Sequence, residues 1–311
     1  MARRSSSSDS GGFLFKTGLF ALLAGLAYWA FNQFSGKKPD DNALPRPTTE
    51  LPSDTTPTKG QSPDAAQPST IADELLPSIP QGAEIVHHTW YALAYDETHE
   101  QAAWTVHELT RDRLNENWAE RPATFLPDPA VRTESATPRD YNSSGYDRGH
   151  LVPAADMAFR EEAISETFFM SNISPQLHAF NGGVWRELEE NTRDWARKFK
   201  KLYVVSGPVL TKPGLGQIGF SKVTVPAYFY KILLAPDQRR AIAFIMPNQR
   251  SDKPLMDYAV TIDQVEKITG IDFFPKLLTG LDEELEGSLD KDAWPVNDKR
   301  YQMRLQKWNN N

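Results

Sequence analysis

The chain has no cysteine among its 311 residues. This absence excludes disulfide bonds and every zinc site that uses cysteine ligands. It also means that the cellular compartment cannot be inferred from redox chemistry. No internal repeat is found either.

Positive charge is scarce relative to negative charge. The chain has 34 Lys and Arg against 41 Asp and Glu, which gives a formal net charge of −7. Phosphate contacts need Lys and Arg, so the overall charge does not favour nucleic acid as a partner. A local basic groove can still lie on an acidic body. Much of the acid forms one late cluster, interpreted as a solvated face: Asp282, Glu283, Glu284, Glu286, Asp290 and Asp292.

One apolar run stands out, at residues 18–31. A bilayer core about 30 Å thick needs about 20 apolar residues in a helix. The run reaches that length if the Lys16 side chain extends toward the membrane surface. A cleaved signal peptide needs small residues at positions −1 and −3 of the cut, but a cut after Ala30 places Tyr28 at −3. The sequence therefore favours an uncleaved transmembrane anchor.

We expect residues 1–35 to form a short cytoplasmic tail and a single transmembrane helix, because basic residues before the apolar run favour the cytoplasmic side: Arg3, Arg4 and Lys16. The folded part would then lie outside the cytoplasm. This means the periplasmic side in a bacterium, or a place at the mitochondrial inner membrane in a eukaryote. Residues 36–78 are rich in Pro, Thr and Ser, which predicts a disordered linker. The folded domain is expected over residues 79–311.

Apolar periodicity places strands and helices in this domain. Strands are expected at 87–95, 102–109, 202–206, 227–235 and 241–247. Helices are expected at 161–169, 184–201 and 261–270. Grouped strands with helices between them, and no regular βαβ rhythm, favour an α+β fold with a mainly antiparallel sheet.

The segment Tyr146–Pro153 carries residues suited to phosphodiester chemistry. Neutral imidazole titrates near pH 6.5, so His150 can act as a general base at neutral pH. Arg148 is two residues away, so on a strand it shares a face with His150 and can offer a planar donor fork to phosphate. Gly149 between them allows backbone or ligand to approach closely. Such a set suits metal-assisted hydrolysis.

Asn181 and Glu189 add an amide and a carboxylate on the following helix. Eight residues of regular helix separate them by about 80° in rotation and about 12 Å along the axis. Two short side chains cannot both contact one ion over that gap. We therefore expect Asn181 as a direct metal ligand and Glu189 acting through a metal-bound water. An ion held by one amide oxygen keeps most of its waters, which suits Mg²⁺.

Tyr146–Pro153 together with Asn172–Glu189 resembles the DNA/RNA non-specific endonucleases, the group that includes mitochondrial endonuclease G and whose core is a ββα-metal finger. The resemblance covers the domain from about Glu84 to about Gly270. It implies a metal-dependent, sugar-non-specific endonuclease that cleaves DNA and RNA to 5′-phosphate and 3′-hydroxyl ends. Mg²⁺ is the implied cofactor, with Mn²⁺ as a substitute. A homodimer is kept as a candidate assembly.

The resemblance also implies roles for individual residues. His150 would be the general base that activates water, and Asn181 the sole direct protein ligand of Mg²⁺. Arg148 and Glu189 would assist catalysis. A second arginine would bind substrate at Arg121, and two others are alternatives for that role: Arg132 and Arg139. Supporting roles are implied for Asp147, Asn172 and Gln176.

Other charged residues receive plainer interpretations. Four histidines lack ligand spacing and are interpreted as surface or packing residues: His87, His88, His99 and His107. His178 is expected to be structural. A basic run is interpreted as a solvated helix face, with a phosphate-tracking rim as the alternative: Arg193, Arg197, Lys198, Lys200 and Lys201.

Two rival functions remain. One is a catalytically idle nucleic-acid-binding or uptake component with the same fold, against which the intact His150 and Asn181 argue. The other is a hydrolase for small phosphodiesters.

Overall fold

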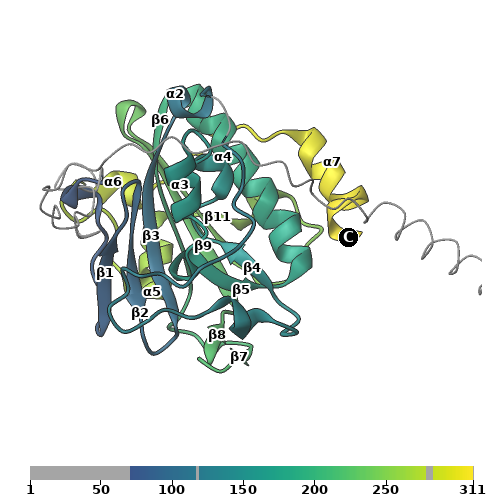
Figure 1. Ribbon diagram of the computed structural model, residues 1–311. Coiled ribbons are helices and arrows are strands. Elements are labelled where there is room, and N and C mark those ends of the chain that lie inside the picture. Colours follow the sequence, from purple (N-terminus) through teal and green to yellow (C-terminus); the bar gives the residue numbers. More distant parts are fainter. Residues whose placement is uncertain (1–70, 117–118, 278–282, 311) are drawn as a thin grey trace, which may run out of the picture. The chain divides into compact units, whose positions relative to one another are not determined.

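The computed structural model describes residues 71–310, apart from 117–118 and 278–282 (Figure 1). The anchor expected at residues 1–35 therefore lies outside the described residues, as does most of the expected linker. Among the helices in the described ranges, none is long and apolar enough to cross a membrane.

An antiparallel sheet of seven strands forms the centre of the domain (Figure 1). Its strands lie in the order β1 (Ala83–His87), β2 (Tyr91–Asp96), β3 (Gln101–Thr110), β6 (Lys201–Pro208), β9 (Tyr228–Ala235), β10 (Arg240–Pro247) and β11 (Ala259–Val260). Helices alternate with groups of strands along the chain. The predicted α+β class with a mainly antiparallel sheet is confirmed.

The expectation of one strand over residues 87–95 is wrong, because β1 ends at His87 and β2 begins at Tyr91. The chain turns between them. There the His88 Nε2 lies 2.9 Å from the buried Asp128 carboxylate. The Thr89 backbone N–H donates to the side chain of Glu166. Both partners are distant in sequence, so local alternation does not reveal the turn.

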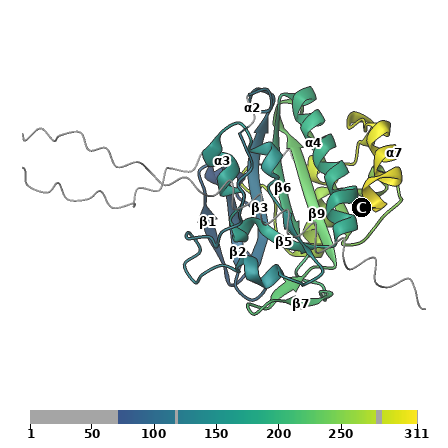
Figure 2. The same ribbon diagram turned by 45° about the vertical axis from the view of Figure 1, so that its right-hand side comes forward.

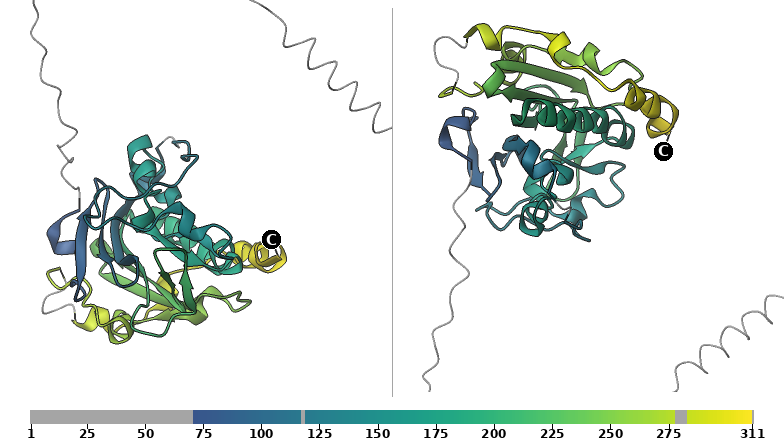
Figure 3. Two further views of the ribbon diagram at one scale, coloured as in Figure 1. Left: turned by 60° about the horizontal axis from the view of Figure 1, so that its bottom comes forward. Right: turned by 90° about the horizontal axis from the view of Figure 1, so that it is seen from above.

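Both faces of the sheet are buried. On β9, Phe229 and Leu233 join the core cluster under α4 (Arg186–Phe199). Ile232 and Leu234 join the cluster under α5 (Ile262–Thr269) on the other face. Seen from above, the sheet lies between α4 and α5 (Figure 3). Burial on both faces explains why this strand is an apolar run rather than an alternating one.

Capping residues mark both ends of α5. The Thr261 side chain accepts a hydrogen bond from the Gln264 N–H, and Gly270 ends α5 with a left-handed φ of 73°. The helix expected over 261–270 is therefore confirmed. The other α-helices in the described ranges are α2 (Arg111–Leu114), α3 (Glu161–Glu166), α6 (Glu283–Glu286) and α7 (Asp298–Gln306). The last of these packs beside α4 (Figure 2).

Two short strands and α4 form a ββα unit beside the main sheet. β4 (Asp147–His150) pairs antiparallel with β5 (Ile173–Gln176). A π-helical turn, η5 (Phe180–Trp185), then leads into α4, and Gly183 within it has non-helical torsions of φ −100° and ψ −112°. The regular helix therefore begins at Arg186, later than the predicted residue 184. A further two-stranded sheet pairs β7 (Gly216–Ile218) with β8 (Val223–Val225).

The packed chain begins before Ile79. A 3₁₀ turn, η1, spans Asp73–Leu75. Ile71 and Leu75 are each only 5% exposed and belong to the core cluster on the α5 face of the sheet. Both residues fall within the stretch that the sequence predicts as linker. Their burial shows that hydrophobic packing extends the folded domain toward the N-terminus.

We expect Leu75→Ala to lower the free energy of unfolding by about 2–4 kcal/mol, because it removes buried methyl groups and leaves a cavity. Urea unfolding followed by tryptophan fluorescence measures the change. The exposed neighbour Glu74→Ala is the control, expected to stay within about 0.5 kcal/mol of the parent. Equal midpoints for the two variants would show that this segment adds nothing to stability.

Candidate active site

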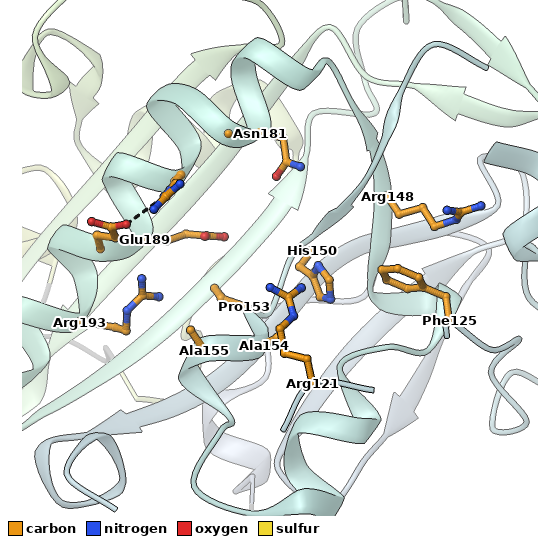
Figure 4. Close-up of a pocket in the computed structure, with 13 residues that line it drawn as sticks. Arg121, Phe125, Arg148, His150, Pro153, Ala154, Ala155, Asn181, Glu189 and Arg193 are labelled. Carbon is orange, nitrogen blue, oxygen red and sulfur yellow. Dashed lines mark hydrogen bonds and ion pairs between the residues drawn. The ribbon is translucent and has the colours of Figure 1, made fainter. Parts of the chain in front are cut away.

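His150 stands at the end of β4 and lines a pocket of about 520 Å³ (Figure 4). Its ring packs between Phe125 and Phe168, at centroid distances of 5.4 and 5.0 Å. Its backbone carbonyl accepts a hydrogen bond from the Trp185 indole. The Nε2 atom is buried and has no hydrogen-bond partner within the described part of the chain. The hydrogen-bonding capacity of this nitrogen is therefore unused among these residues.

Burial and, as the smaller cause, the positive charge of Arg121 together lower the pKa of His150 to about 3. Both causes disfavour the imidazolium ion. The ring is consequently neutral at neutral pH, which is the form that accepts a proton.

Arg148 lies on the pocket wall with His150, as its position on the strand predicts. Its Nη2 donates to the Pro138 carbonyl and to the Asn142 side chain, both at 2.8 Å. The guanidinium carbon stands 5.6 Å from the centre of the Phe125 ring. The loop before β4 thus fixes where this cation points.

Gly149 makes room for a side chain of the neighbouring strand. A Cβ atom at this position would lie 2.2 Å from the Cδ atom of Gln176, which is fully buried. A close approach to Gly149 is therefore present as expected, but the approaching group is the Gln176 side chain rather than backbone or ligand. Only glycine lets β4 and β5 pair in this register.

Asn172 holds the chain that follows His150. Its Oδ1 accepts from the Val152 N–H at 2.9 Å, and its Nδ2 donates to the carbonyls of Val152 and Thr167. All polar atoms of this buried amide are used. The supporting role expected for Asn172 in the active site stays a prediction.

Asp147 orients the amide of Asn181. Its Oδ2 accepts from the Asn181 Nδ2 at 2.9 Å and pairs with the His178 Nδ1 at 2.8 Å. Because the amide nitrogen is engaged, the Asn181 oxygen is turned away from Asp147. Asn181 lines the pocket (Figure 4), so this oxygen is the one available to a ligand.

Glu189 reaches the same pocket from α4. The regular-helix spacing predicted between it and Asn181 is wrong, because η5 and the break at Gly183 lie between them. Burial raises the pKa of Glu189 to about 7, against the opposing effect of nearby Lys231 and Arg193. This carboxyl group therefore depends on positive neighbours to stay ionised at neutral pH.

Buried charges surround Glu189. The Arg193 Nη1 lies 3.0 Å from Asp156, whose other oxygen lies 3.3 Å from the His107 Nε2. Lys231, only 1% exposed on β9, donates to the Ser206 hydroxyl and stands 4.7 Å above the Trp185 ring. Lys231 is not among the predicted site residues, although one lysine inside an apolar strand is a signal for a buried partner.

The basic run divides between two environments. Arg193 lines the pocket, so its interpretation as part of a solvated face is wrong. It follows Glu189 by four residues, and this spacing places both on one side of a helix. The other members of the run do not line the pocket: Arg197, Lys198, Lys200 and Lys201.

Of the three candidates for the second arginine, Arg121 is the one in the pocket (Figure 4). Its guanidinium lies 5.4 Å from the Phe168 ring centre. The Leu126 N–H donates to the Phe168 carbonyl and the Met170 N–H donates to the Leu126 carbonyl, and these bonds hold the loop in place. Arg132 instead pairs with Glu84, and Arg139 lies in the turn Pro138–Tyr141; neither lines the pocket.

The family model described as DNA/RNA non-specific endonuclease matches residues 77–280. The chain belongs to the DNA/RNA non-specific endonuclease family. This match includes every residue that lines the pocket and ends before α7.

Relatives carry nuclease names. Nuclease EXOG, mitochondrial, of Xenopus laevis is 37% identical over 213 residues, which are 63% of this chain and 60% of the relative. Endonuclease G, mitochondrial, of Homo sapiens is 32% identical over 215 residues, or 64% of this chain and 72% of that protein. Nuclease C1 of Cunninghamella echinulata var. echinulata is 38% identical over 205 residues, covering 60% and 81%. The chain thus spans less than two thirds of the Xenopus relative.

A solved structure also matches this endonuclease-family chain. It is a crystal structure of an EndoG/EndoGI complex, described as showing the mechanism of EndoG inhibition. The TM-score is 0.58 at 29% identity, and the match covers 62% of this chain and 86% of the other.

We expect Arg121→Gln to raise the pKa of His150, because it removes a positive charge that disfavours the imidazolium ion. The pKa should stay below the ordinary value of about 6.5, since burial is the larger cause. An NMR titration of the His150 ring measures the shift. Arg132→Gln, which changes the same charge outside the pocket, should leave it unaltered; a fall, or no change, in the Arg121 variant would contradict the assignment.

Proposed function

We propose that this family member is a metal-dependent, sugar-non-specific endonuclease that hydrolyses phosphodiester bonds of DNA and RNA, leaving 5′-phosphate and 3′-hydroxyl ends. One observation carries the proposal. A neutral histidine, whose Nε2 has no hydrogen-bond partner among the residues that the structure describes, shares a pocket with an oriented amide oxygen and arginines from three segments: Arg121, Arg148 and Arg193.

His150 acts as the general base in this proposal. Its Nε2 accepts a proton from water, and the resulting hydroxide attacks phosphorus while the bond to the 3′ oxygen breaks. The nucleophile is water, so the ribose 2′-hydroxyl is not needed and DNA and RNA are both substrates. The residues of the pocket address phosphate and water, and such contacts carry no base sequence directly.

The arginines stabilise the charge that develops on the phosphoryl oxygens. Arg148 is preorganised, because its Nη2 donates hydrogen bonds to the Pro138 carbonyl and the Asn142 side chain. Arg121 stands on the other side of His150 in the close-up (Figure 4). Donors that are already aimed need no reorganisation at the moment of reaction, which is where such groups contribute most to rate.

The donor set fits a hard divalent cation such as Mg²⁺, with Mn²⁺ as a substitute. Asn181 would bind it through Oδ1, because Asp147 already occupies the amide nitrogen. Glu189 would supply nearby negative charge, and its raised pKa means that a cation would favour its ionised form. When bound, the cation would act as a Lewis acid and stabilise the leaving oxygen. Asp147, Asn172 and Gln176 hold the site in shape in this proposal.

Membrane attachment through residues 1–35, with the nuclease domain outside the cytoplasm, is part of the proposal and rests on the sequence alone. Two of the relatives are named as mitochondrial. The homodimer remains a candidate assembly.

The direct test is cleavage of supercoiled plasmid and of matched RNA in the presence of Mg²⁺ or EDTA. We expect both polymers to be cut with Mg²⁺ and neither with EDTA. Binding without cutting would instead identify the idle nucleic-acid-binding component. Inertness toward RNA would overturn the sugar-non-specific part while leaving a DNA nuclease.

We expect His150→Ala to lower cleavage by at least about 10²-fold while nucleic-acid binding survives, because only proton transfer is lost. Initial nicking rates and a filter-binding assay on the same preparations measure the two effects. His87→Ala is the control, because this exposed histidine of β1 does not line the pocket, and the variant should keep the parent rate. A nicking rate near that of the parent protein would eliminate His150 as the base.

Asn181→Ala should shift the Mg²⁺ concentration for half-maximal activity more than Glu189→Ala does. Removal of the direct ligand should cost more than removal of an indirect partner, which is typically worth about 10–100-fold. Metal titrations of activity for both variants provide the comparison. Superimposable Mg²⁺ curves would count against this division of roles.

A further inference from the structure

The segment 298–310, formed by α7 and a final 3₁₀ turn η9 (Trp308–Asn310), lies beyond the region that the family model matches. It packs along α4, the helix that carries Glu189 (Figure 2). It also contacts η5, the turn that carries Asn181. This segment therefore borders the candidate active site without belonging to the family core.

A buried arginine anchors the segment. Arg304 is 0% exposed and pairs with the buried Glu187 of α4. Its other guanidinium nitrogens donate to the carbonyls of Ser251 and Lys253. Two charges removed from water need this kind of complete pairing, and loss of one partner leaves an uncompensated charge. The segment is thus docked in one defined position.

The docked segment reaches the rim of the pocket. The guanidinium of Arg186, which lines the pocket, stands 4.2 Å from the centre of the Trp308 ring. Its side chain remains 51% exposed. Asn309 lies against Gly183, with its Oδ1 only 2.9 Å from where a Cβ would be. Trp308 therefore fixes the direction of a cation that faces the pocket.

The segment also compensates an acidic group at this rim. Glu190 lines the pocket and would repel a phosphate. It is paired with Arg186 and with Arg300 of α7, each at 3.0 Å. The Arg186 bond uses Nε, which leaves its terminal amino groups for other acceptors.

We propose that Arg186, held on Trp308, binds a phosphate of the nucleic-acid chain other than the one at His150, so that segment 298–310 is part of the substrate-binding surface. His150 and Arg148 approach the pocket from β4, whereas Arg186 approaches from the start of α4. A stacked guanidinium is weakly hydrated, planar and preorganised for phosphate. The inference rests on the proposed nuclease activity and deepens it by naming a polymer-specific contact.

The test compares a polymer with a substrate that lacks a second phosphate. The polymer is plasmid DNA, and the small substrate is bis(p-nitrophenyl) phosphate, both with the full chain and Mg²⁺. We expect Arg186→Gln to lower kcat/KM for the polymer about tenfold more than for the small diester. The plot of log kcat/KM against log salt for the polymer should become less steep by about one unit, as expected for one lost phosphate contact.

Three variants serve as controls. Arg197→Gln changes the same charge on the same helix, but its side chain pairs with Asp194 outside the pocket; it should leave the polymer preference and the salt slope in place. Trp308→Leu should reproduce the effect of Arg186→Gln. Trp308→Phe, which keeps an aromatic face, should retain most of the parent protein's preference for the polymer. Unfolding midpoints confirm that each variant is folded.

Equal losses on both substrates in Arg186→Gln would overturn the proposal, as would identical salt slopes for Arg186→Gln and Arg197→Gln. A Trp308→Leu protein that is folded and keeps the parent preference would remove the segment from the binding surface. If the parent chain itself cleaves neither substrate, the proposed nuclease function fails, and the inference fails with it.

Discussion

The hydrogen bond from Asn181 to Asp147 is the contact on which the candidate site depends most. It ties the strand that carries His150 to the turn that precedes α4. It also decides which atom of the Asn181 amide is available, because the nitrogen is already engaged. The Asp147 carboxylate on β4 thereby sets the distance between His150, the proposed base, and Asn181, the proposed metal ligand. The register of β4 is itself fixed by Gly149, over which the Gln176 side chain lies.

Burial around this contact gives the site its electrostatic character. The same withdrawal from water that keeps His150 neutral raises the pKa of Glu189. Two titratable groups in one pocket are therefore pushed toward their uncharged forms. Lys231 and Arg193 counteract the effect on the carboxyl group, and they can do so because interactions are stronger in a medium of low dielectric. β9 supplies the lysine, so the central sheet contributes charge as well as support.

The sequence predicts the parts of this architecture that depend on local patterns. Arg148 and His150 share a strand face because two residues separate them, and α5 ends at Gly270 because that residue adopts a positive φ. What the sequence could not provide depends on distant contacts. The turn after His87 is held by Asp128 and Glu166, and the break at Gly183 faces Asn309. The position of Arg121 is likewise set by backbone bonds that its loop makes with a distant segment.

The net charge of −7 and the character of the pocket are not in conflict, because arginines outnumber acidic side chains in the pocket lining. Four arginines and two glutamates line it: Arg121, Arg148, Arg186, Arg193, Glu189 and Glu190. Two other acidic residues of α4, Glu187 and Asp194, are compensated by arginines of α7. A polyanion responds to the electric field at the site rather than to the net charge of the whole chain, since solvent and salt screen charges beyond about 10 Å. The C-terminal helix thus influences the candidate active site through the charges it neutralises, and an acidic chain can present a positive pocket.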